Sequence, residues 1–149
     1  MSYMKIALDE GYKGIRNGEG GPFGSVIVKD GEVIGQGHNR VLADHDPTMH
    51  GEVAAIRNAC QNIGSHSLKG CILYTTAYPC PMCMSAALWA GIDRIIYGCT
   101  VKDTADIGFN DDNFYEAIKS GEAIPLECED RDECLELFRE YDGLRAQRY

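Results

Sequence analysis

Hydrophobic and polar residues in the first third of the chain follow two different periods. Residues 4–15 carry apolar side chains at a helical spacing that glycines interrupt, and a glycine-rich stretch follows them. Residues 23–29 and 32–37 are apolar, β-branched runs joined by Asp30-Gly31, a dipeptide that favours a two-residue hairpin turn. The pattern predicts a short first helix and then an antiparallel hairpin.

The middle of the chain alternates between helix-like and strand-like patterns. Residues 52–63 have one apolar helical face, and residues 72–76 form a short apolar run typical of a buried strand. Residues 80–90 suit a helix opened by Pro79, and residues 94–97 suit another strand. This order is typical of a βαβ unit.

The last third of the chain is more polar and predicts three further elements. Residues 114–119 suit a short helix, residues 123–127 a strand, and residues 131–144 a charged amphipathic helix. No linker, repeat or low-complexity tract divides the chain, so we expect residues 1–149 to form one domain. The order of elements predicts an α/β layered fold with a mixed sheet.

The composition narrows the class of partner. The 149 residues, 44% of them hydrophobic, are enough to bury one sizeable core. The 23 acidic and 14 basic residues give a net charge of -9, which repels phosphate backbones and anionic lipid headgroups. We therefore expect a small, neutral substrate, and neither a nucleic acid nor a membrane as a partner.

The apolar runs and the cysteines indicate a compartment. No apolar run approaches the roughly 20 residues needed to span a bilayer, and residues 1–10 lack the apolar core of a signal peptide. The seven cysteines are odd in number and several lie in apolar stretches, which argues against a disulfide framework. The sequence predicts a cytoplasmic protein whose special cysteines are metal ligands.

Two short motifs carry chemistry. His50-Gly51-Glu52 and, after 26 intervening residues, the run Pro79-Cys80-Pro81-Met82-Cys83 form the H-x-E and P-C-x-x-C signature of zinc deaminases. One imidazole and two thiolates supply three of the four tetrahedral positions that zinc prefers and leave the fourth for water. An open position is typical of a catalytic site, so we expect one Zn2+ per subunit, held by His50, Cys80 and Cys83.

The spacing of these residues suggests how the site reacts. Cys80 and Cys83 lie three apart at a helix start, so both sulfurs share one face and the helix end favours their thiolate form. Zinc lowers the pKa of bound water to about 7, which makes hydroxide available as a nucleophile. Glu52, two residues from His50, is placed to move a proton from water to the ring nitrogen and the leaving amine. The residues predict a zinc-dependent hydrolytic deaminase.

Simpler interpretations of the two motifs exist. A lone C-x-x-C is often a redox pair or half of a structural zinc site, and a structural zinc normally needs four protein ligands. The remaining cysteines lie in apolar runs or lack a nearby histidine: Cys60, Cys71, Cys99, Cys128 and Cys134. Catalysis is therefore favoured over a zinc-stabilised interaction module.

Beyond these motifs, the chain resembles the cytidine deaminase-like superfamily, and within it the bacterial guanine deaminases. The matching stretches are residues 20–24, 46–48, 79–83, 89–90 and 108–111, together with the final Tyr149. The resemblance implies a three-layer α-β-α fold, with a five-stranded mixed sheet flanked by helices and zinc at the N-termini of two of them. It also implies a homodimer in which a C-terminal segment, about residues 131–149, is exchanged between subunits.

The resemblance further implies a set of substrate-binding residues. Asn39 would hydrogen-bond the base, Phe23 and Trp89 would line its pocket, and the backbone of Gly51 and Glu52 would hold its ring. Three positions would complete purine recognition: Asp111, Glu133 and Tyr149. Taken alone, the acidic residues suit solvated surface, Trp89 suits a core position and Asn39 suits a turn.

The resemblance implies deamination of a free base, guanine, to xanthine and ammonia. Tyr78 departs from this pattern, because guanine and tRNA adenosine deaminases commonly have Glu before Pro79. The stretches Gly37-His38-Asn39 and His50-Gly51-Glu52 also occur in fungal cytosine deaminase. Deamination of cytosine or another amino-substituted heterocycle therefore stays open as an alternative, as does a tRNA adenosine deaminase, which would need a basic surface.

Overall fold

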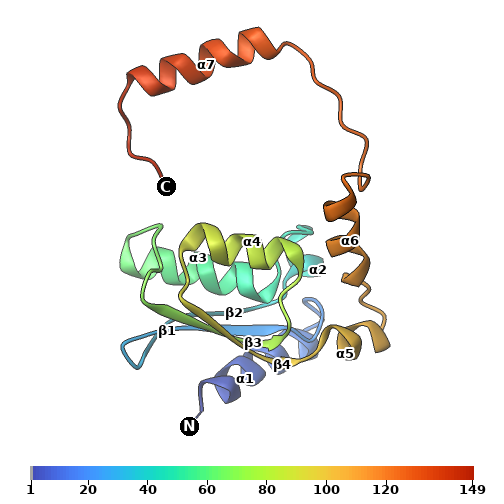
Figure 1. Ribbon diagram of the computed structural model, residues 1–149. Coiled ribbons are helices and arrows are strands. Elements are labelled where there is room, and N and C mark those ends of the chain that lie inside the picture. The colour runs from blue at the N-terminus through green and yellow to red at the C-terminus, as the bar shows by residue number, and fades with distance from the viewer. Residues whose placement is uncertain (1) are drawn as a thin grey trace.

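The computed structural model describes residues 2–149 and contains a four-stranded sheet with helices on both faces (Figure 1). In chain order the elements are α1 (Tyr3–Arg16), β1 (Gly24–Lys29), β2 (Glu32–His38), α2 (Val41–Asp44), α3 (Gly51–Ile63), β3 (Cys71–Ala77), α4 (Pro81–Ala90), β4 (Arg94–Cys99), α5 (Val101–Asp106), α6 (Asp112–Ser120) and α7 (Arg131–Gly143). The short helices α2 and α5 have no counterpart in the sequence prediction.

The sheet is mixed, with strand order β2-β1-β3-β4. Strand β1 pairs antiparallel with both β2 and β3, whereas β3 and β4 are parallel. The predicted hairpin is confirmed: Asp30 and Gly31 both have positive φ, 49° and 81°, as a two-residue turn between twisted strands requires. The parallel pair β3–β4, joined by α4, is the predicted βαβ unit.

Two helices begin beside each other because local signals fix their ends. Helix α3 begins after His50 and α4 has Pro81 in its first turn, a position where the missing N–H costs nothing. Both helices end at a glycine with a left-handed backbone, Gly64 and Gly91. Their N-termini therefore carry the two motifs to the same region of the fold.

The core lies on both faces of the sheet because β1 alternates its side chains. Val26 and Val28 pack with Ala7 of α1 on one face. Ile27 packs with Leu73 on the other face, beneath α3 and α4. Burying each such aliphatic side chain contributes about 1.5–3 kcal/mol, so these two layers hold the site rigidly.

The expected fifth strand is wrong. Residues 123–127 are irregular, and Ile124 and Leu126 are 72% and 88% exposed. A strand forms only against a partner, and this stretch follows α6 away from the sheet and reaches no strand edge. The apolar pattern of a strand is present, but no strand edge lies close enough for residues 123–127 to pair with.

The C-terminal arm, residues 121–149, stands off the body (Figure 1). Helix α7 confirms the predicted amphipathic helix, yet within the described chain none of its residues is buried. The end of the arm returns to α4, where the ring of Tyr149 lies 5.9 Å from that of Trp89. No helix among residues 2–149 is long and apolar enough to cross a membrane.

Candidate active site

The predicted metal ligands converge at the two helix N-termini. His50 is the N-cap residue of α3, Cys80 is the N-cap residue of α4, and Cys83 lies in the first turn of α4. The Nδ1 atom of His50 is 3.5 Å from the Sγ atoms of both cysteines. Bonds of about 2.0–2.3 Å at tetrahedral angles separate such ligand atoms by about 3.5 Å, so the three residues fit a zinc ion.

The charges of the three ligands also suit a cation. The pKa of Cys80 falls to about 4, because its sulfur accepts a hydrogen bond from Cys83 and a further one from His50. The same contact with Cys80, together with burial, raises the pKa of Cys83. The Cys80 thiolate in turn raises the pKa of His50. Zinc ligation requires thiolates, so an ion held here would displace the remaining thiol proton.

Beside the ligands lies a buried carboxylate, Glu52, which is 4% exposed. Its Oε1 accepts a hydrogen bond of 2.5 Å from the Thr75 hydroxyl, whose oxygen accepts one of 3.1 Å from the Ser25 hydroxyl. The two hydroxyls fix the direction of the Glu52 carboxylate. Sequence analysis missed both hydroxyls; their only signal was small polar residues inside apolar strands.

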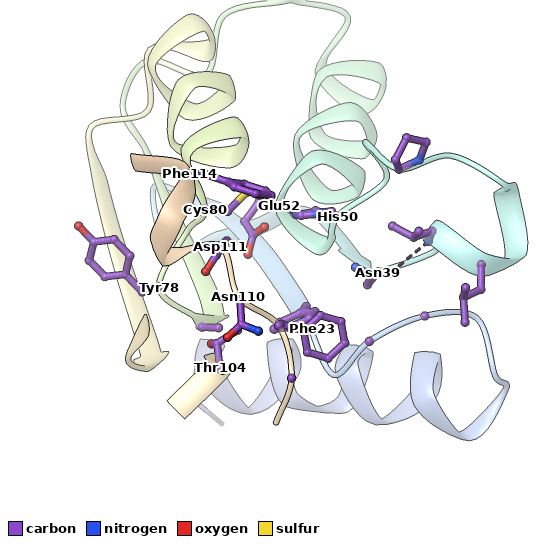
Figure 2. Close-up of a pocket in the computed structure, with 18 residues that line it drawn as sticks. Phe23, Asn39, His50, Glu52, Tyr78, Cys80, Thr104, Asn110, Asp111 and Phe114 are labelled. Carbon is purple, nitrogen blue, oxygen red and sulfur yellow. Dashed lines mark hydrogen bonds between the residues drawn. The ribbon is translucent and has the colours of Figure 1, made fainter. Parts of the chain in front are cut away.

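A cavity of about 520 Å³ opens in front of these groups (Figure 2). Its walls combine glycines, three phenylalanines and a few polar side chains: Gly20, Gly21, Phe23, Asn39, Val41, Leu42, Pro47, His50, Glu52, Ala77, Tyr78, Cys80, Thr104, Gly108, Phe109, Asn110, Asp111 and Phe114. The volume and the mostly apolar lining are typical of small-molecule sites.

Several predicted substrate residues line this cavity. Phe23 meets Phe109 edge to face with 5.1 Å between ring centroids, and the two rings form an apolar wall. Asn39 is buried, and its Oδ1 accepts a hydrogen bond from the Val41 backbone, which leaves its NH2 group to donate. Gly51 packs on the Phe23 carbonyl so closely that an added Cβ would lie 2.7 Å from that oxygen.

Asp111 is the second carboxylate of the cavity and precedes α6. Burial raises its pKa, and the negative charge of Cys80 adds to the effect. Figure 2 shows Asp111 and Glu52 around the same space. An acceptor placed here suits a ring N–H of a bound heterocycle.

The structure does not place four of the predicted residues in the cavity wall. Gly51 packs against Phe23 without lining the cavity. Trp89 lies on α4, is 67% exposed and is also outside the residues that line the cavity. Glu133 lies in the first turn of the exposed helix α7, and Tyr149 rests on Trp89. One chain therefore builds the cavity from residues 20–114 alone.

Sequence analysis missed other cavity residues on the segment after the sheet. Phe109, Asn110 and Phe114 line the cavity, as does Thr104 of α5. The sequence pattern that could have indicated them is a cluster of aromatic residues within a polar stretch. A single sequence does not show that this cluster lies beside residue 50.

An open His-Cys-Cys centre at paired helix N-termini, with a buried glutamate two residues from the histidine, defines a zinc-dependent hydrolytic deaminase. Comparison with known families agrees. The family model "Cytidine and deoxycytidylate deaminase zinc-binding region" matches residues 1–99, and the chain belongs to this family.

Individual relatives are similar to different extents. A guanine deaminase of Bacillus subtilis is 45% identical over 117 residues, which cover 78% of this chain and 75% of the relative. A tRNA-specific adenosine deaminase of Aquifex aeolicus is 40% identical over 100 residues, 67% of this chain and 66% of its own length. The crystal structure of a guanine deaminase from Bacillus subtilis superposes with a TM-score of 0.92 at 39% identity, covering 99% of this chain and 96% of the other.

Proposed function

We propose that the protein deaminates free guanine to xanthine and ammonia. The observation that carries the proposal is the extent of the similarity: a guanine deaminase structure matches 99% of the chain, including the segment after residue 99 that brings Asp111 to the cavity. The phenylalanine walls suit a flat ring, while the Asp111 carboxylate and the Asn39 amide suit its N–H and carbonyl groups.

The chain's own residues perform the binding and the proton transfers. Zinc, when bound by His50, Cys80 and Cys83, lowers the pKa of water to about 7 and so supplies hydroxide. Glu52 takes one proton from water and delivers it to a ring nitrogen, while the oxygen of water bonds to the ring carbon. Glu52 then carries the second proton of water to the amine, the carbon–nitrogen bond breaks, and the amine leaves as ammonia.

A panel of substrates tests this function. We expect the zinc-loaded protein to release ammonia from guanine faster than from cytosine, adenine, guanosine or a tRNA anticodon loop, with xanthine formed in equal amount. Preferential release from cytosine would assign the site to that base instead. Tight, salt-sensitive binding of tRNA would favour the nucleic-acid substrate.

Cytosine or another amino-substituted heterocycle remains the second candidate because of Tyr78. This residue lines the cavity directly before the zinc-binding loop, and its ring packs edge to face against Tyr97 at 5.1 Å. A phenol at this position changes the polar groups that a base meets. The net charge of -9, in contrast, disfavours a polyanionic RNA.

We further propose that the single deaminase domain works as a cytoplasmic homodimer that exchanges the C-terminal arm. The exposed face of α7 carries Leu137 and Phe138, which are 66% and 67% exposed, and α4 exposes Leu88 and Trp89. An amphipathic helix is stable in water only when a body covers its apolar face. None of the seven cysteines forms a disulfide in the described chain, as a reducing compartment favours. Light scattering should give twice the chain mass; a monomeric mass would contradict the proposal.

In such a dimer, the substrate would be bound between subunits. The arm would contribute Glu133 and Tyr149, and the surface on which the arm docks would contribute Trp89. Their distance from the cavity within one chain fits this arrangement, since the arm reaches no part of its own cavity. The tail deletion described below tests this role.

A further inference from the structure

One wall of the cavity is formed by a segment that has few attachments to the rest of the fold. We call residues 107–120 the cover segment; it includes α6 and supplies Phe109, Asn110, Asp111 and Phe114 to the cavity. The remaining walls belong to the end of β3, to the N-termini of α3 and α4, to the short helices α2 and α5, and to the loops between these elements. The cover segment follows the last strand, and no residue of α6 is buried in the described chain.

One hydrogen bond attaches α6 to the body. The Tyr115 hydroxyl donates to the Pro79 carbonyl at 2.8 Å. Among the hydrogen bonds and ion pairs of residues 2–149, it is the only one that joins residues 110–149 to the chain before residue 100. The edge contact between Phe109 and Phe23 is a second attachment, and the Phe109 backbone N–H donates to the Thr104 carbonyl of α5 at 3.2 Å.

The acceptor of this hydrogen bond is firmly held. Pro79 is fully buried and directly precedes the ligand Cys80. The preceding residue, Tyr78, donates its backbone N–H to the Cys99 carbonyl at 2.8 Å, which ties the loop to the end of β4. A hydroxyl on α6 that reaches this carbonyl therefore sets the position of the helix relative to the metal ligands.

The donor keeps its proton at working pH. Burial raises the pKa of Tyr115 to about 12, and nearby negative groups add to the effect. The hydroxyl therefore donates throughout the neutral range.

From this geometry we infer that Tyr115 is a positioning residue: its hydrogen bond to Pro79 holds the cover segment closed, with Asp111 and Phe114 against the bound base. The inference rests on the proposed function and adds a residue that does not itself touch the substrate. A net hydrogen bond of ordinary strength changes the ratio of closed to open cover segment by about 3- to 10-fold. Affinity for the base falls by up to the same factor, and by the full factor when the open state predominates without the bond.

A pair of Tyr-to-Phe variants tests the inference. Tyr115→Phe keeps the ring and removes the hydroxyl. Tyr3→Phe is the matched control, because the Tyr3 hydroxyl also donates to a backbone carbonyl, that of Gly31 at 2.7 Å, from α1 on the opposite face of the sheet. We expect Tyr115→Phe to raise KM for guanine about 3- to 10-fold, with kcat within twofold of wild type and full zinc content. Tyr3→Phe should match wild type in both constants.

The two kinetic constants separate positioning from mere stabilisation. A purely structural role for Tyr115 would lower the melting temperature and leave KM unchanged, and that result would overturn the inference. A loss of zinc or of kcat at unchanged KM would also overturn it, because the hydroxyl would then support the metal loop. If wild type turns over cytosine instead of guanine, the proposed function fails, and the same comparison of KM is made with cytosine.

A second measurement does not depend on how Tyr115→Phe folds. Hydrogen–deuterium exchange is followed in the zinc-loaded Glu52→Gln protein, with and without the guanine analogue 8-azaguanine. We expect the analogue to slow exchange of residues 112–120 relative to α7, since the base stabilises the closed cover segment. Unchanged exchange of residues 112–120 at saturating analogue would overturn the inference.

Discussion

At the scale of single residues, the site depends on a short chain of buried polar groups. Glu52 lies between the metal ligands and the hydroxyls of Thr75 and Ser25, which come from two neighbouring strands. A buried carboxylate is costly without partners, so these hydroxyls both stabilise Glu52 and fix its direction. The Glu52 carboxylate is therefore held by the sheet as well as by its own helix.

Replacing Glu52 by Gln tests its role as the proton carrier. The amide keeps the shape and the hydrogen bond from Thr75 but cannot shuttle a proton. We expect kcat to fall by at least about 100-fold, with zinc content unchanged by metal analysis. Near-normal turnover would mean that another residue moves the proton.

Replacing Thr75 by Val tests the direction of Glu52. The substitution keeps the shape, removes the hydrogen bond to Oε1 and leaves the Ser25 hydroxyl without its acceptor. We expect kcat to fall about 10-fold, because a hydrogen bond to a charged group contributes about 1.5–3 kcal/mol. Thr75→Ser, which retains the hydroxyl, is the control and should stay close to wild type. Equal kcat in the Val and Ser variants would remove Thr75 from the mechanism.

At the scale of elements, a cluster of charged side chains joins α1, β2 and the glycine-rich loop between α1 and β1, residues 17–23. His38 is buried at the end of β2; its Nδ1 lies 2.6 Å from Glu10 of α1, and its Nε2 contacts Glu19. The His38 ring therefore joins a carboxylate of α1 to a carboxylate of the loop that follows α1. Glu19 also pairs with Arg40 at 2.8 Å. The cluster fixes Asn39, which lies between His38 and Arg40.

The pairing of Glu19 with His38 and Arg40 makes the stability of the folded protein depend on pH. The hydrogen bond from His38 and the charge of Arg40 lower the pKa of Glu19 from its ordinary 4.5. A carboxyl whose pKa is lowered by folding stabilises the fold above its unfolded pKa and loses this effect as pH falls through its folded pKa. We expect the melting temperature of wild type to fall more steeply below pH 4.5 than that of Glu19→Gln. Calorimetry between pH 6 and pH 3 measures both.

The control for this comparison is Asp9→Asn, which removes a carboxylate of an exposed pair with Lys5 on α1. Its melting temperature should follow wild type across the range, because an exposed pair contributes little. Parallel curves for wild type and Glu19→Gln would show that the cluster does not couple to acidity.

At the scale of the whole molecule, the C-terminal arm is the feature that one chain leaves without a partner. Tyr149 is 82% exposed and Leu144 is 68% exposed, whereas the body of the molecule is closely packed. An exposed apolar surface of this kind is typical of an interface. The residues of one chain line the cavity, whereas the arm would find its partner only in the proposed dimer.

Deleting Arg148 and Tyr149 tests the arm. Because neither residue is buried, we expect folding and zinc content to be unchanged. If Tyr149 closes the cavity of the partner subunit, kcat/KM for guanine should fall at least about 10-fold, a loss of roughly 1.4 kcal/mol for each factor of ten. A truncated protein with unchanged kcat/KM would make this tail an ordinary exposed terminus.

The sequence by itself determined the local features of this protein. The Asp30-Gly31 turn, the helices expected to start near residues 52 and 80, and the two short motifs that carry His50, Cys80 and Cys83 all follow from short-range rules. Turn dihedrals, helix caps and ligand types depend on residues only a few positions apart, so a single sequence reveals them.

Only the tertiary structure decided which distant residues meet. Thr75 and Ser25 reach Glu52 through strand register, and Tyr115 reaches Pro79 through the path of the chain after β4. Residues 123–127 have the pattern of a strand but remain irregular, because pairing needs a free sheet edge nearby. Such encounters depend on packing over many residues, which periodicity and spacing do not encode.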